Sequence, residues 1–112
     1  MGFIDRAVFD TIRSLGFAGI GAGYAVIGGP LANRAVILTF KNATNGDVFV
    51  SADGVNDNLL LPANSFNVFD IRTNAPNNTN LIFPIGTQFY LKDGPTASTA
   101  GTFYIEVLTI RT

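Results

Sequence analysis

The sequence predicts an all-β fold, a small antiparallel β-sandwich of the jelly-roll-like kind, preceded by an N-terminal arm or short helix. Short runs of β-branched and aromatic residues recur from Arg34 to the end of the chain. Clusters of Gly, Pro, Asn and Asp separate these runs, as in turns between strands. Hydrophobic residues make up 47% of the 112 residues, enough for the core of one domain. We expect an arm and linker over residues 1–30 and the sandwich over residues 31–112.

Two conformations remain open for the first residues of the chain. Apolar side chains follow one another there at helical spacing: Ile4, Val8, Ile12 and Leu15. This spacing predicts a short amphipathic helix that ends at Gly16. Several of the residues involved are poor helix formers by propensity, which favours an extended arm instead.

The glycine-rich stretch GFAGIGAGYAVIGGP, residues 16–30, has three interpretations. A dinucleotide-binding loop needs a third glycine where Tyr24 stands, and a helix after it, and neither condition is met. A signal peptide needs a basic segment before the apolar run, but Asp5 and Asp10 precede it. The run is also too short and too rich in glycine to span a membrane. We therefore expect a linker or arm that lies close against another backbone.

The region after Arg34 reads as a series of strands with period-2 alternation. The strand-like runs are RAVILTFK (34–41), DVFVSA (47–52), LLLPA (59–63), SFNVFDIR (65–72), LIFPIG (81–86), TQFYLK (87–92) and TFYIEVLTI (102–110). Pro62 suits a sheet edge, since proline cannot donate to a strand ladder. In the last run Phe103, Ile105 and Val107 are expected to face one way, and Tyr104, Glu106 and Leu108 the other.

Composition excludes several functions. Seven basic residues against eight acidic ones, with no basic run, do not predict nucleic-acid binding. The chain has no His and no Cys, so it lacks disulfides, thiolate nucleophiles, the usual zinc ligands and the commonest general base. We therefore expect no enzyme activity, no metal and no cofactor. Charged residues are only 13%, and a neutral polar surface is readily covered by a partner.

Three groups of residues suggest chemistry, and each has a simpler structural interpretation. Asp53 to Asn58 superficially resembles a calcium loop, but its glycine is misplaced and no distant Glu completes it, so a turn is expected. Asp70 and Glu106 are a conceivable pair for glycoside hydrolysis, but strand carboxylates usually face solvent. The three tyrosines would form a sugar-stacking platform only if the fold brought them together: Tyr24, Tyr90 and Tyr104.

The region from Ala35 to Val107 carries the segments KNATNGDVFVSADGVNDNLLLPANSFNVFDIRTN, PIGTQFYLK and GTFYIEVL. In these segments the chain resembles the decoration (cement) proteins that staple the capsids of short-tailed, epsilon-15-like bacteriophages. The resemblance implies a non-enzymatic virion structural protein, made in the host bacterial cytoplasm and located on the outer capsid surface. It also implies two partners, the major capsid protein and the chain itself, as a homodimer.

Large apolar residues of the N-terminal segment are the expected partner contacts, because no predicted strand buries them in their own domain. They are Phe3, Ile4, Phe9, Phe17, Ile20 and Tyr24. A short helix packed on one end of the sandwich would bury the same residues. Two other functions stay open, a head-tail connector or fibre subunit and a carbohydrate-binding module.

Overall fold

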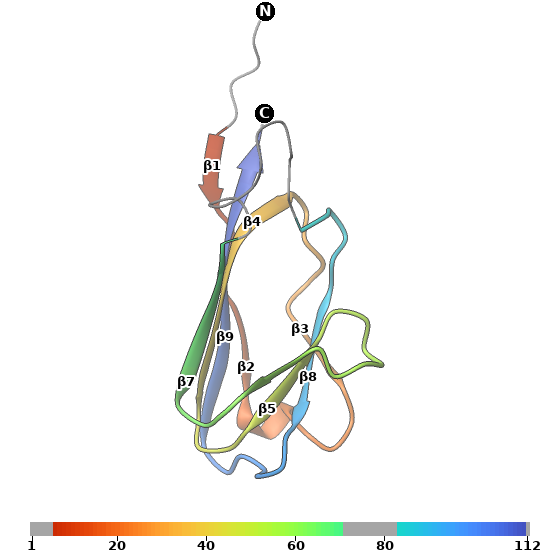
Figure 1. Cartoon of the computed structure of the whole chain (residues 1–112), viewed down its shortest axis with the longest axis vertical. Coiled ribbons are helices and arrows are strands. Elements are labelled where there is room, and N and C mark those ends of the chain that lie inside the picture. Colours follow the sequence, from red (N-terminus) through yellow and green to blue (C-terminus); the bar gives the residue numbers. More distant parts are fainter. Residues whose placement is uncertain (1–5, 71–82, 112) are drawn as a thin grey trace, which may run out of the picture.

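A computed structural model describes residues 6–70 and 83–111 as two antiparallel sheets that pack against each other (Figure 1). Sheet A has the order β1-β9-β4-β7, and β2 also pairs with β9; its strands are β1 (Arg6–Phe9), β2 (Arg13–Gly16), β4 (Arg34–Thr44), β7 (Ser65–Asp70) and β9 (Gly101–Arg111). Sheet B has the order β3-β8-β5-β6; its strands are β3 (Ala25–Ile27), β5 (Val48–Ser51), β6 (Leu59–Leu61) and β8 (Phe89–Asp93). The predicted all-β sandwich is confirmed.

The strand alternation predicted for the end of the chain is confirmed. Phe103, Ile105 and Val107 on β9 are buried between the sheets, while the residues between them point to the other side of sheet A. In sheet B, β6 lies at an edge and ends immediately before Pro62, as the proline predicts.

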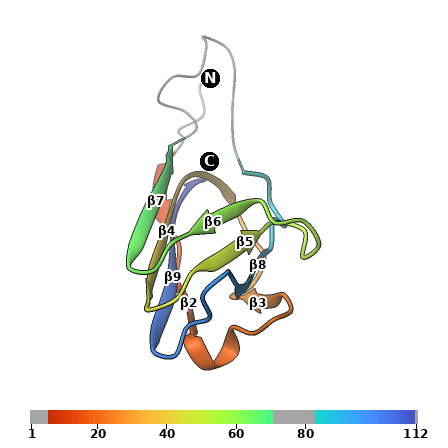
Figure 2. The same cartoon turned by 60° about the horizontal axis from the view of Figure 1, so that its bottom comes forward.

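Aromatic rings join the two sheets in the core. The Phe40 ring on β4 packs edge-to-face against the Phe69 ring on β7, with ring centres 5.7 Å apart. It makes the same kind of contact, at 5.5 Å, with Phe89 on β8 of the other sheet. In Figure 2, β5 and β6 run across the view while β4, β7 and β9 run up it, so the strands of the two sheets differ in direction.

Residues 6–9 and 13–16 form strands, so of the two conformations left open for this segment the short helix is wrong over the described residues. β1 pairs with residues 108–111 of β9, and β2 pairs with residues 102–105 further along the same edge. Val8 lies opposite Thr109 and Leu15 opposite Phe103. The unpaired edge of an eleven-residue strand offers a ladder of hydrogen bonds, and this outweighs a weak helical spacing.

The glycine-rich stretch is also part of the sandwich and not a linker ahead of it. It contains a short 3-10 helix, Phe17–Gly19, and the strand β3. Ile20 and Ile27 belong to the core. Gly28 has a φ of +65°, and a Cβ there would lie 2.5 Å from the side chain of Arg13, so glycine is needed at this close approach. Residues 6–30 therefore belong to the same unit as the strands that follow.

Candidate functional site

The outer face of sheet A, the side turned away from sheet B, carries exposed apolar side chains. Phe9 is 79% exposed, Phe66 is 70% exposed and Val68 is 48% exposed. The strand register places these side chains on the same side of sheet A as the residues opposite them on the adjacent strands. We call this surface the outer face; it consists of Phe9, Ile12, Ile37, Thr39, Lys41, Phe66, Val68, Tyr104, Glu106 and Leu108.

Alternation along each strand decides which residues reach the outer face. Leu38 and Phe40 on β4 point into the core, so Ile37 and Thr39 point outward. β1 continues the same face because Phe9 lies directly opposite Leu108. Residues from both ends of the chain and from its middle therefore meet on one sheet.

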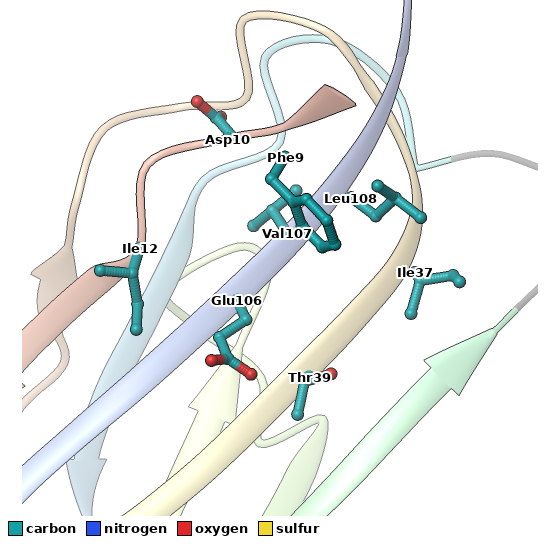
Figure 3. A pocket seen from close by; sticks show the side chains of 8 residues that line it. All are labelled: Phe9, Asp10, Ile12, Ile37, Thr39, Glu106, Val107 and Leu108. Atoms are coloured by element: carbon teal, nitrogen blue, oxygen red, sulfur yellow. The ribbon is translucent and has the colours of Figure 1, made fainter. Parts of the chain in front are cut away.

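A groove of about 330 Å³ lies in the outer face where β1, β9 and β4 run side by side. Figure 3 shows the Phe9 ring over β9, with Leu108 and Ile37 beyond it and Glu106 and Thr39 further along the two strands. The complete lining is Phe9, Asp10, Ile12, Ile37, Thr39, Glu106, Val107 and Leu108. Most of these side chains are apolar, so a partner's apolar side chain would leave water on entering the groove.

The two acidic side chains that line the groove are both paired within the chain. Lys41 Nζ lies 3.1 Å from Glu106 Oε1, across the two central strands. The buried guanidinium of Arg13 lies 3.3 Å from Asp10 Oδ2 and also donates to the carbonyl oxygen of Gly29 at 3.2 Å. Covering this face would therefore desolvate few unpaired charges.

The contact residues predicted from the sequence do not form one surface. Phe9 lies on the outer face, and Phe17 lies on the 3-10 helix at the end of the sandwich, where it is exposed. Ile20 is only 5% exposed and packs in the core, so the prediction that it contacts a partner is wrong. Phe3 and Ile4 lie outside the described residues.

Tyr24, the remaining predicted contact, lies beside sheet B and fastens a loop of its own chain. Its hydroxyl donates to the carboxylate of Asp57, and Lys92 Nζ lies 2.9 Å from the same carboxylate. The Lys92 ammonium also lies 4.8 Å from the centre of the Tyr24 ring. Burial, and then the bond to Asp57, raise the pKa of Tyr24 to about 12. The hydrogen bond from Tyr24, followed by Lys92, lowers the pKa of Asp57.

The turn predicted for Asp53 to Asn58 is confirmed. The Asp53 carboxylate accepts hydrogen bonds from the backbone N–H groups of Val55 and Asn56, both at 2.8 Å, and from the Ser51 hydroxyl at 2.7 Å. These bonds hold the pKa of Asp53 well below its usual range, and the bond from the Asn56 N–H has the largest effect. Within residues 6–70 and 83–111, no three His, Cys, Asp or Glu side chains are grouped so that they could hold a metal ion.

The other two groups singled out from the sequence are divided by the fold. Tyr104 stands on the outer face of sheet A, whereas Tyr24 and Tyr90 belong to the sheet B side, so the three tyrosines form no single platform. Asp70 on β7 and Glu106 on β9 are separated by the intervening strand β4, and Glu106 is paired with Lys41.

Sequence reasoning missed most of the outer face. Ile12, Ile37, Phe66 and Val68 were not predicted as contact residues. One signal was present in the predicted strand 65–72, which has apolar residues on both of its sides: Phe66 and Val68 alternate with Phe69. A strand with only one side in the core does not need apolar residues on the other.

Comparison with protein-family models, with curated proteins and with solved structures gives no match to this chain. In the part of the chain that the structure describes, no helix is both long enough and apolar enough to cross a membrane.

Proposed function

We propose that this protein is a non-enzymatic structural protein that docks on another protein surface through the outer face of sheet A. The exposure of Phe9, at 79% beside a groove with apolar walls, is the observation that carries the proposal. A side chain of this size stabilises a complex by up to about 3 kcal/mol when it is fully buried.

The dimensions of the outer face suit a protein partner. Four strands lie side by side across sheet A, which at about 4.8 Å spacing gives a width of roughly 19 Å. A length of about nine residues at roughly 3.3 Å each gives about 30 Å, and hence an area on the order of 600 Å². A standard protein interface takes about 800 Å² from each partner, which is of the same order.

The resemblance to phage decoration proteins supports a specific partner, the major capsid protein of a short-tailed, epsilon-15-like bacteriophage. In this role the protein binds the outer surface of the capsid and staples neighbouring subunits. Packaged DNA strains the contacts between those subunits. A protein that engages two subunits at once gains avidity and stabilises the assembled state by mass action.

The test is binding to expanded capsids of an epsilon-15-like phage that lack their own decoration protein. Phe9→Ser should weaken co-sedimentation with the capsids at least about tenfold, which corresponds to about 1.4 kcal/mol. Val55→Ser is the matched control, because Val55 is 78% exposed but lies on the loop beside sheet B. Equal binding by both variants and the unaltered chain would show that the outer face is not the docking surface.

A further inference from the structure

An ion pair lies at the centre of the outer face, between its two most exposed aromatic rings. Lys41 Nζ on β4 is 3.1 Å from Glu106 Oε1 on β9. β9 and β4 are the middle strands of the order β1-β9-β4-β7, whereas Phe9 lies on β1 and Phe66 on β7. A partner that covers both exposed rings therefore also covers the ion pair between them.

Each member of the pair lines a different hollow of the outer face. Glu106 lines the groove beside Phe9 (Figure 3). Lys41 lines a second hollow, with a volume of about 270 Å³, at the β7 side of the same face. The other residues that line this second hollow are Asn42, Ala43, Asn64, Ser65 and Phe66. One hollow thus has the anionic member of the pair in its lining, and the other has the cationic member.

The contact within the pair uses only part of what its two groups can bind. An ammonium group has three N–H donors and a carboxylate has two acceptor oxygens, but the contact joins Lys41 Nζ to Glu106 Oε1 alone. The two side chains are 48% and 42% exposed, so solvent reaches both. A partner that covers the pair removes this water, and its own polar groups then have to replace the lost hydrogen bonds.

We propose that the partner carries a matching pair of opposite charges, an acidic group over Lys41 and a basic group over Glu106. This inference rests on the proposed docking through the outer face and adds the chemistry of the surface that docks there. An apolar partner surface would desolvate both charges without compensation, whereas a matching pair completes an alternating set of four charges. A partner of the reversed polarity would place like charges against each other.

The ion pair also determines the orientation of the partner. Lys41 and Glu106 are the two charged residues in the outer face as defined above, and its other members are apolar or carry a hydroxyl group. Apolar burial has no direction, so the exposed rings alone accept a partner in several orientations. Two opposite charges on neighbouring strands accept a charged partner in one polarity only.

Exchange of the two charges tests the proposal. The double variant Lys41→Glu/Glu106→Lys keeps one charge of each sign at these positions and leaves the net charge of the chain at −1. It should bind expanded epsilon-15-like capsids that lack their own decoration protein at least about a hundredfold more weakly than the unaltered chain, because like charges would meet.

The matched control is the double variant Lys41→Gln/Glu106→Gln, which has the same net charge but no charge at either position. It loses the attraction without adding repulsion, so its binding should be about tenfold weaker than that of the unaltered chain. Because the original side chains are both exposed, both double variants should unfold at the same urea concentration as the unaltered chain.

The readout is co-sedimentation with the capsids over a range of chain concentrations, with circular dichroism to show that each variant is folded. Full binding by the exchanged variant would overturn the proposal and leave docking through the outer face in place. Equal losses in the two double variants would also overturn it, since a neutral amide of the partner would then meet the pair in either polarity. If the unaltered chain does not bind, the proposed function is refuted, and this inference with it.

Discussion

Phe9 on β1 lies directly opposite Leu108 on β9, and both side chains line the groove in the outer face of sheet A. The pair joins residues from nearly opposite ends of the chain. Because β1 and β2 are held in the sheet by β9, the aromatic ring of Phe9 is presented to solvent from an ordered strand. A partner that covers this ring does not have to order a free arm, so the entropic cost of binding is smaller.

A buried amide fastens the turn after β4, and its removal should destabilise the fold. Asn42 is 1% exposed, and its Nδ2 donates to the carbonyl oxygens of Gly46, Leu61 and Pro62 at 2.9 to 3.0 Å. Its Oδ1 accepts from the Thr44 hydroxyl at 2.6 Å. Asn42→Ala removes these hydrogen bonds from a buried site and should lower the free energy of unfolding by about 2–4 kcal/mol.

Urea unfolding followed by circular dichroism measures this loss. Asn67→Ala removes an exposed amide from the same sheet and should change the free energy of unfolding by less than about 0.5 kcal/mol. Equal stability of the two variants would mean that the Asn42 network contributes nothing.

Gly101 begins β9 in a conformation that other residues avoid. Its φ is +100°, and a Cβ there would lie 2.2 Å from the carbonyl oxygen of Ala43. Gly101→Ala should therefore cost about 2 kcal/mol or more, through strain and displacement of β4. Gly16→Ala is the control, since nothing lies within 4 Å of its added Cβ and the change should stay within about 0.5 kcal/mol. If both variants melt at the same temperature as the unaltered chain, the conformation and close contact at Gly101 do not require glycine.

The pKa of Tyr24 predicts how stability changes in alkali. The folded chain raises this pKa to about 12, from about 10 in an unfolded chain. A group whose pKa is higher in the folded than in the unfolded chain stabilises the fold at pH values below its unfolded pKa. For Tyr24 this contribution is lost as the pH rises from about 10 to 12. Tyr24→Phe should therefore melt at a lower temperature than the unaltered chain at pH 8, and the difference should shrink toward pH 12.

Tyr104→Phe, on the other sheet, controls for the general effect of losing a tyrosine. If the difference between Tyr24→Phe and the unaltered chain stays constant from pH 8 to pH 12, the bond between Tyr24 and Asp57 does not contribute to stability.

Local patterns were sufficient to predict the named strands after Arg34, although residues 83–86 of the predicted strand 81–86 form only an isolated bridge at Phe83 and a turn. Phe103, Ile105 and Val107 alternate because β9 has one side in the core, and Pro62 marks an edge because it cannot donate a hydrogen bond. Both signals are properties of the strand itself, so they are visible without knowledge of its neighbours.

The N-terminal residues could not be predicted in the same way, since their structure depends on a distant strand. β1 and β2 have four residues each and take their register from β9, which lies 86 to 105 residues further along the chain. Ile20 enters the core as a single residue between two glycines, and Ile27 enters it directly before Gly28, which leaves no periodic pattern. The outer face combines residues of four strands, β1, β4, β7 and β9, with Ile12 between β1 and β2, and only Phe9 among its members was predicted as a contact.

The most direct test of the central claim is cryo-electron microscopy of the chain bound to expanded epsilon-15-like capsids that lack their decoration protein. We predict density on the outer surface of the capsid, with sheet A toward the capsid and the Phe9 groove filled by a side chain of the major capsid protein. Absence of binding, or contact through sheet B and the loop at Asp53 while Phe9 remains in solvent, would contradict the account.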